Sequence, residues 1–307
     1  MTGDGERSPD EQLIGGRYRL LERLGAGPSG TVWRARDEQE QRDVAVKEPV
    51  LPGDPADDEE SRRLAHRLHT EARAAARVRH ASAVTLHDVV TEDGLPWIVM
   101  ELVQGESLRE AVRRGPLEPA EAARVGLAVL GALRAAHAVG IVHRDIKPAN
   151  VLIESGTGRV VVTDFGIGDG HVAEAPAEFV APERASGRGA GPASDLWSLG
   201  SLLATAVEGG DAGPLGPLLT RLRAPEPEAR PGAEEVAAVL EVCGGVAPVV
   251  PVASVASVAP VGETTPEPEP EPRPAPPAPA PAPTPDPRRR TPLAALGLLL
   301  AKKPGAE

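Results

Sequence analysis

The sequence predicts a fold of mixed helices and strands around an aliphatic core, in one large domain or two small ones, and three observations lead to this prediction. Segments with strand-like and helix-like patterns alternate from about residue 18 to about residue 242. The chain has 307 residues, which is enough for one large domain or two small ones. Hydrophobic residues make up 41% of the chain and aromatic residues only 2%, so we expect a core of leucine, valine, isoleucine and alanine.

Charge and cysteine content limit the kinds of partner and environment. The formal net charge is −12, which argues against a nucleic-acid partner because proteins that bind nucleic acids carry a basic field. The single cysteine, Cys243, cannot form an internal disulfide, and the polar, acidic N-terminal residues do not form a signal peptide. These features favour a reducing, cytoplasmic setting.

The segments on either side of this region have different compositions. Residues 1–17 are expected to form a flexible N-terminus, and residues 244–290 a disordered linker rich in proline and alanine. Proline at about every second position between residues 264 and 287 removes backbone donors and favours an extended spacer. The tail, residues 291–307, has a run of nine apolar residues (293–301), too short to cross a bilayer as a helix. Two interpretations of the tail stay open: a solvated or self-associating end, and weak contact with a membrane surface or a partner.

Glycines separate two strand-like runs near the start of the region. Gly25, Gly27 and Gly30 lie in LGAGPSGTVW, between YRLLERL and TVWRAR. A glycine turn between strands lets backbone N–H groups approach a polyphosphate, although a plain turn has the same pattern. The run VAVK follows, and its alternation places Ala45 and Lys47 on one face of a strand.

A helix is predicted over residues 59–80, where apolar residues share one face. Glu71 lies within this apolar stripe. A buried carboxylate needs a cationic partner, and Lys47 is the natural candidate. The alternative is that Glu71 lies at the rim of the stripe and is solvated.

Two further segments bring chemically active residues together. HRDIKPANVLI, residues 143–153, contains Asp145, Lys147 and Asn150, and VVTDFG, residues 161–166, ends a hydrophobic strand with Asp164. An acid for a substrate hydroxyl, an amide and a carboxylate for a divalent metal, and a lysine for the moving phosphate form one set. The set indicates phosphoryl transfer.

Seven motifs follow one another in an order that resembles eukaryotic-type protein kinases, closest to the bacterial Ser/Thr kinases. They are the glycine turn, VAVK, the helix glutamate, HRDIKPAN, DFG, APE (181–183) and DLWSLG (195–200). The resemblance covers about residues 18–242. It implies an α+β fold, namely a bilobal kinase domain over residues 18–243, with a small β-rich N-lobe (18–103) and a larger, shortened helical C-lobe (104–243). The implied activity is that of an ATP-dependent protein Ser/Thr kinase that acts on protein substrates with ATP and Mg²⁺, or with Mn²⁺ as an alternative. A second hypothesis is an ATP-binding pseudokinase or signalling scaffold.

The resemblance also assigns roles to residues. Lys47 is expected to hold the α- and β-phosphates and to pair with Glu71. Asp145 is expected to accept the proton of the substrate hydroxyl or orient it, and Lys147 to neutralise the γ-phosphate. The predicted metal ligands are Asn150 and Asp164, and the predicted ATP-binding residues are Leu24, Gly25, Gly27, Gly30, Val32, Ala45, Lys47, Met100, Glu101, Val103 and Leu152.

Structural contacts follow from the same resemblance. Met100 resembles the gatekeeper, and the hinge, residues 101–103, is expected to give backbone hydrogen bonds to adenine. Glu183 is expected to pair with Arg230 in a buried ion pair. Asp195 is expected to cap the backbone of the catalytic loop.

The chain departs from the family pattern in its activation segment, residues 164–183. No Ser, Thr or Tyr lies between DFG and APE, so phosphorylation of this loop is not expected to be the switch. Arg144, next to the catalytic Asp, often pairs with a phosphate in such kinases. Here an acidic side chain is the candidate replacement, namely Asp169, Glu174 or Glu178, and the alternative is that these acids are solvated.

Two more departures concern substrate handling. Aligning Phe179 with the usual aromatic residue places Pro176 where the family has a threonine that supports the catalytic Asp. The chain between DLWSLG and Arg230 is also short, and the family uses this region to dock protein substrates. Both departures favour the scaffold hypothesis, whereas the complete set of catalytic residues favours an active kinase.

Overall fold

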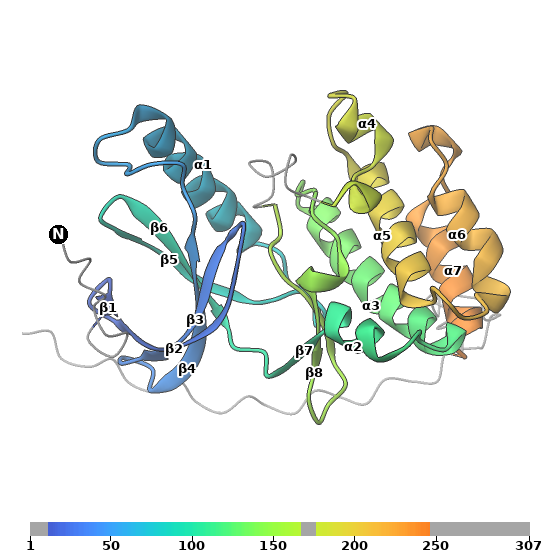
Figure 1. Cartoon of the computed structure of the whole chain (residues 1–307), viewed down its shortest axis with the longest axis horizontal. Coiled ribbons are helices and arrows are strands. Elements are labelled where there is room, and N and C mark those ends of the chain that lie inside the picture. Colours follow the sequence, from blue (N-terminus) through green and yellow to red (C-terminus); the bar gives the residue numbers. More distant parts are fainter. Residues whose placement is uncertain (1–11, 167–175, 246–307) are drawn as a thin grey trace, which may run out of the picture. The chain divides into compact units, whose positions relative to one another are not determined.

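The computed structural model describes residues 12–166 and 176–245 (Figure 1). The chain begins with a six-stranded antiparallel sheet in the order β1-β2-β3-β4-β6-β5. Its strands are β1 (Leu13–Ile14), β2 (Tyr18–Gly27), β3 (Gly30–Asp37), β4 (Arg42–Pro49), β5 (Leu86–Glu92) and β6 (Leu95–Glu101). The predicted strand–turn–strand around the glycines is therefore confirmed as β2 and β3.

Helix α1 (Glu59–Ala75) covers this sheet and contacts β5 and β6. Asp58 begins the helix by accepting a hydrogen bond from the backbone N–H of Ser61, and Glu59 and Glu60 favour the positive end of the helix dipole. The inward face is small and apolar, with Ala65, Leu68, Ala72 and Ala75 buried. Helix α1 and the first sheet form the β-rich N-lobe.

A short three-stranded sheet, in the order β7-β8-β9, follows the N-lobe. Its strands are β7 (Gly105–Ser107), β8 (Val151–Glu154) and β9 (Val160–Val162). Ser107 ends β7 and also caps helix α2 (Leu108–Arg114), because its hydroxyl accepts the N–H of Glu110 while the Glu110 carboxylate accepts the N–H of Ser107. This small sheet carries the predicted catalytic segments at the ends of β8 and β9.

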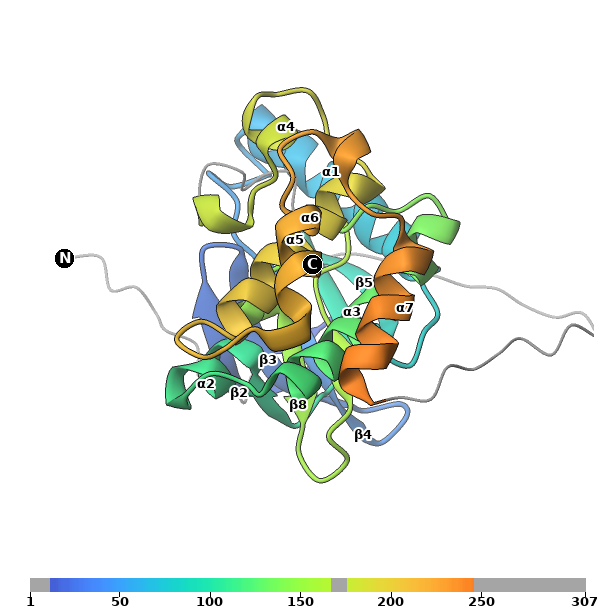
Figure 2. The same cartoon turned by 90° about the vertical axis from the view of Figure 1, so that its right-hand side faces the viewer.

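Helices make up the rest of the C-lobe. They are α3 (Pro119–Ala138), α4 (Pro182–Ala185), α5 (Pro192–Ala206), α6 (Gly216–Leu222) and α7 (Ala233–Gly244), with short 3₁₀ turns η2 (Pro148–Asn150), η3 (Ala177–Phe179), η4 (Gly213–Leu215) and η5 (Pro227–Ala229). Helix α3 packs against α5 and α7 (Figure 2). None of the helices within residues 12–166 and 176–245 is long and apolar enough to cross a membrane.

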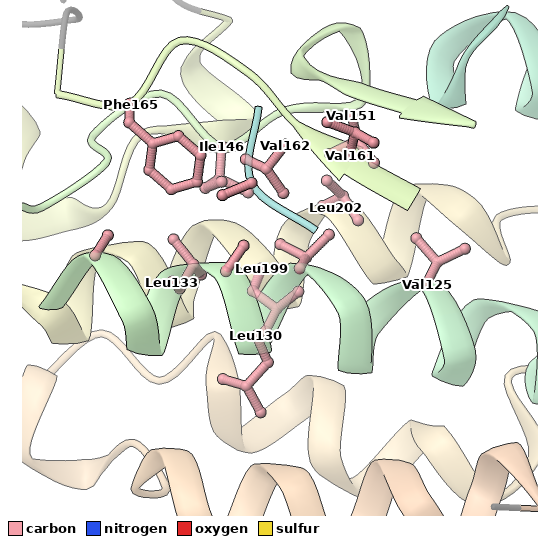
Figure 3. Close-up of a cluster of buried hydrophobic side chains, with 14 of the residues drawn as sticks. Val125, Leu130, Leu133, Ile146, Val151, Val161, Val162, Phe165, Leu199 and Leu202 are labelled. Atoms are coloured by element: carbon pink, nitrogen blue, oxygen red, sulfur yellow. The ribbon is translucent and has the colours of Figure 1, made fainter. Parts of the chain in front are cut away.

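The main core is aliphatic, as the composition predicts. Leu130 and Leu133 of α3 and Leu199 of α5 lie beneath Val161 and Phe165, which belong to β9 and the segment after it (Figure 3). Phe165 is the one aromatic residue among the buried members of this cluster. The cluster also includes Ala45 and Met100, so it continues from the C-lobe into the N-lobe behind the predicted nucleotide site.

A buried ion pair joins α4 to the segment before α7. Arg230 donates to both carboxylate oxygens of Glu183, at 2.7 and 2.8 Å, and the Ser194 hydroxyl donates to the same carboxylate at 2.6 Å. Burial alone would raise the pKa of Glu183, but the hydrogen bonds from Arg230 and Ser194 outweigh it and lower the pKa to about 2. The predicted Glu183–Arg230 pair is confirmed.

Candidate active site

The glycine turn leaves open space where a phosphate group can approach. A Cβ at Gly25 or at Gly27 would meet nothing within 4 Å. Gly30 has a different reason to be glycine: its φ is +137°, and a Cβ there would lie 2.1 Å from the carbonyl oxygen of Glu48. Gly30 therefore lets β3 pair closely with β4, and Gly25 and Gly27 keep the outer surface of the turn clear.

Lys47 lies in β4 opposite Val32 and is 4% exposed. Its Nζ lies 2.9 Å from Oδ1 of Asp164, at the end of the segment that follows β9. Burial would raise the pKa of Asp164, but the positive charge and the hydrogen bond of Lys47 outweigh it, so the net shift of the pKa is downward. The two residues, 117 positions apart in the sequence, form one ion pair across the lobes.

The predicted pairing of Lys47 with Glu71 is corrected by this geometry. Within the described residues, the ion pair of Lys47 is with Asp164, and Oε1 of Glu71 lies 3.8 Å from the guanidinium of Arg144. Glu71 lies on α1 and is partly buried, so its carboxylate needs a cation, and Arg144 of the catalytic loop provides one. The pattern on the helix placed Glu71 at the site, but it could not decide which cation lies nearest.

The catalytic loop brings Asp145, Lys147 and Asn150 together. Nζ of Lys147 lies 2.8 Å from Oδ2 of Asp145. The amide nitrogen of Asn150 donates to the same oxygen at 2.8 Å and to the backbone carbonyl of Asp145 at 2.9 Å. The Asp145 side chain is still 20% exposed, so a substrate hydroxyl can reach it.

Asp195 of α5 forms hydrogen bonds with the backbone of this loop. Its carboxylate accepts the N–H groups of His143 at 2.9 Å and Arg144 at 2.8 Å, as the resemblance predicts. Arg144 has φ of +71°, a strained conformation that these contacts stabilise. A third donor, Nε2 of His137 at the end of α3, lies 2.7 Å from Asp195 and was not predicted. A histidine near a helix end gives no signal of its own in the sequence.

His143 links the loop to the DFG segment and was also missed. Its Nε2 lies 2.8 Å from the carbonyl oxygen of Thr163, and its Nδ1 accepts the N–H of Asp145 at 3.2 Å. The imidazole ring lies 4.8 Å from the ring of Phe165. Because both ring nitrogens are used, the ring fixes the position of Asp145 relative to Asp164, whose φ is +62°.

Several of the predicted adenine-pocket residues lie together. Ala45 of β4 pairs with Met100 of β6, both are buried, and Val32, Val103 and Leu152 pack against the same cluster. Leu24, by contrast, is 49% exposed at the glycine turn, where it is free to cover a ligand. Glu101 ends β6 as the first residue of the hinge.

The donors present suit a hard divalent cation. The amide nitrogen of Asn150 is used twice by Asp145, which leaves its amide oxygen available, and Asp164 supplies a carboxylate. Oxygen ligands of this kind fit Mg²⁺, which protein sites commonly hold with one or two carboxylates and the phosphates of the substrate. The described part of the chain contains no cluster of three or more His, Cys, Asp or Glu side chains that could bind a metal alone.

Comparisons with known proteins support the resemblance. The family model for the protein kinase domain matches residues 18–212. The Ser/Thr-protein kinase PknA of Mycobacterium tuberculosis is 40% identical over 212 residues, which cover 64% of this chain and 48% of PknA. For PknL of the same species the identity is 36% over 214 residues, which cover 66% of this chain and 52% of PknL. The chain thus spans about half the length of these curated relatives.

A solved structure supports the fold. The kinase domain of Mycobacterium tuberculosis PknI, as a double mutant, has a TM-score of 0.67 and 28% sequence identity, and the match covers 78% of this chain and all of that domain. The bilobal α+β fold is therefore confirmed. With a family model that matches more than half of its length, this chain belongs to the protein kinase domain family.

Proposed function

We propose that this chain is an ATP-dependent protein Ser/Thr kinase that transfers the γ-phosphate of ATP to hydroxyl groups of protein substrates. The observation that carries the proposal is the cluster of Asp145, Lys147 and Asn150, fixed through His143 beside the Lys47–Asp164 pair. Phosphoryl transfer depends mainly on positioning and on compensation of charge, and these residues supply both.

Each residue has a separate task in this proposal. Asp145 accepts a hydrogen bond from the substrate hydroxyl and orients it toward the γ-phosphate. Lys147, already 2.8 Å from Asp145, neutralises the charge of the moving phosphate. Lys47 would bind phosphate oxygens of the nucleotide in place of Asp164, and Asn150 and Asp164 would hold the metal. The bound metal would compensate the charge on the phosphates.

The identity of the metal and the extent of the domain belong to the same proposal. Members of this family use ATP and a divalent metal, and the oxygen donors of Asn150 and Asp164 favour Mg²⁺, with Mn²⁺ as an alternative. We place the kinase domain at residues 18–243, because α7 extends the helical lobe beyond residue 212 and packs against α3. The cytoplasmic setting and the absence of a nucleic-acid partner stay predictions from composition. The proposed linker and tail, and weak contact of the tail with a membrane surface, concern residues 246–307, which lie outside the described residues.

Control of the kinase is proposed to be independent of phosphorylation between DFG and APE. Asp169 and Glu174 lie outside the described residues, and Glu178 is exposed, so the predicted contact of one of these acids with Arg144 stays a prediction. Pro176 directly precedes the turn η3 and has neither a hydroxyl nor an N–H group to offer Asp145. The contacts of Asp145 in the described residues come instead from Lys147, Asn150 and His143.

The test is phosphate transfer from labelled ATP to a generic basic protein, with the full chain and Mg²⁺. Wild type should label the protein, and Asp145→Asn should lower the rate by about a hundredfold or more, because the carboxylate that orients the hydroxyl is lost. Asp57→Asn is the matched control, since Asp57 is an exposed residue in the loop before α1, and it should leave the rate unchanged. Binding of ATP without any labelling would overturn the kinase proposal in favour of the scaffold.

A further inference from the structure

The hinge begins at Glu101, whose side chain is already engaged by the protein. The backbone N–H of Glu101 donates to the carbonyl of Thr85 at 2.9 Å. In return, Oε1 of the Glu101 carboxylate accepts the backbone N–H of Thr85 at 2.8 Å. The first hinge residue is therefore fixed to the segment that leads into β5.

Arg159 binds the other oxygen of the same carboxylate. It lies in the turn between β8 and β9, and its guanidinium donates to Oε2 of Glu101 at 2.8 Å. Nε of Arg159 lies 3.5 Å from the carboxylate of Glu154, and a second guanidinium nitrogen donates to the carbonyl of Ala81 at 3.5 Å. One cation from the C-lobe thus connects the hinge, β8 and the chain before β5.

The same turn holds the hinge region at a second point. The backbone N–H of Ser155 donates to the carbonyl of Gln104 at 2.8 Å. Glu101 and Gln104 both form hydrogen bonds with the β8–β9 turn. These contacts fix the hinge on both sides of residues 102 and 103. The backbone of these two residues is the part of the chain expected to meet adenine.

Burial makes the contact stronger than an ordinary surface pair. The side chains of Arg159 and Glu101 are 32% and 21% exposed. A half-buried carboxylate loses part of its hydration, and the guanidinium of Arg159 compensates its charge with a charged hydrogen bond. Without Arg159, Glu101 would turn toward solvent more readily and the hinge would sample more conformations.

We propose that Arg159 is a positioning residue for nucleotide binding, which acts through Glu101 by holding the hinge in the conformation that receives adenine. The proposal rests on the proposed function, since it concerns the ATP site of the kinase. Arg159 does not itself touch the nucleotide in this proposal. By holding the hinge in place, Arg159 reduces the conformational entropy that the hinge loses when the nucleotide binds. Removal of the Arg159 side chain should therefore weaken nucleotide binding and should not slow the chemical step.

The test is the Kd for ATP with Mg²⁺, measured by titration calorimetry on the full chain. Arg159→Ala should raise the Kd by about threefold to tenfold, less than the loss of one direct charged hydrogen bond would cause. Arg159→Lys keeps the charge but cannot reach Glu101 and Ala81 together, so its Kd should lie between those of wild type and Arg159→Ala. The rate of phosphate transfer at saturating ATP should stay within about twofold of wild type.

Glu101→Gln shows whether Arg159 acts through Glu101. The glutamine still accepts the N–H of Thr85 but carries no charge, so adding Arg159→Ala to it should change the Kd much less than in wild type. Arg114→Ala is the matched control, because Arg114 forms an exposed C-lobe ion pair with Glu106 and should leave the Kd unchanged.

The Kd values of the variants test the role of Arg159, and ATP binding by the wild-type chain tests the proposed function. An unchanged Kd in Arg159→Ala, with only a lower melting temperature, would show a purely structural role and overturn the inference alone. Equal effects of Arg159→Ala in the wild-type and Glu101→Gln backgrounds would overturn the route through Glu101. Failure of the wild-type chain itself to bind ATP would overturn the proposed function, and this inference with it.

Discussion

The Glu183–Arg230 pair in the C-lobe is buried on both sides, whereas the pair between the lobes joins a buried Lys47 to a partly exposed Asp164. The first pair is saturated, meaning that every N–H donor of its cation is used, and the second is not. Arg230 makes five hydrogen bonds, two to Glu183 and three to backbone carbonyls. Lys47 has three N–H donors, and among the described residues it makes a single hydrogen bond, to Asp164. A saturated pair has no capacity left for a ligand, whereas an ammonium with unused donors can exchange its partner for phosphate oxygens.

The two ion pairs also differ in solvent exposure and in backbone conformation. The side chains of Arg230 and Glu183 are 1% and 9% exposed, whereas Asp164 is 21% exposed. Asp164 also has a positive φ, a conformation that costs energy and is common at functional sites. The C-lobe pair is therefore suited to stabilise the fold, and the pair between the lobes is suited to receive a ligand.

The largest expected effect is the loss of stability when the saturated pair is broken. Arg230→Met keeps the apolar volume but leaves Glu183 as a buried, uncompensated charge, so the free energy of unfolding should fall by about 3–5 kcal/mol. Arg221→Met, which breaks the exposed pair with Glu235, is the control and should cost less than about 1 kcal/mol. Urea denaturation of both variants measures this. Similar losses in the two would contradict a structural role for the buried pair.

The sequence predicted much of this arrangement, but not all of it. Asp145, Lys147 and Asn150 lie within a stretch of six residues, so their closeness in the chain already placed them together. The Glu183–Arg230 pair and the Asp195 cap came from family resemblance, because no local pattern joins residues so far apart. The partners of Lys47 and Glu71 were misassigned for a physical reason: two cations and two carboxylates share the site, and only the three-dimensional distances decide the pairing.

Residues that act by holding another side chain left no signal of their own in the sequence. Arg159 lies in an ordinary turn, SGTGR, and its partner Glu101 was predicted only for its backbone. Their contact depends on the antiparallel register of β8 and β9, which brings the turn to the hinge. His137 is similar, because its role depends on Asp195 lying beneath the end of α3.

A second expected effect is a dependence of stability on pH that comes from the saturated pair. The pKa of Glu183 is about 2 in the folded protein, well below the ordinary value of 4.5. The stabilisation from this group is therefore complete above about pH 4.5 and is lost as the pH falls toward 2, in total about 3 kcal/mol. Glu183→Gln should be less stable than wild type at pH 6, and the difference should shrink to near zero at pH 2. Denaturation at both pH values measures it, and a constant difference would contradict the assignment.

The smallest expected effect on stability belongs to the unsaturated pair, where the effect on activity should be large. Lys47→Met keeps the buried stem of the side chain, and the partly exposed Asp164 can gain water or a proton, so unfolding should become easier by less than about 2 kcal/mol. The rate of phosphate transfer should fall by about a hundredfold or more, because the phosphates lose a positive charge held in place. Urea denaturation and the labelling assay on the same preparation give both numbers. A stability loss as large as that of Arg230→Met, at unchanged activity, would show that Lys47 serves the fold and not the exchange with a nucleotide.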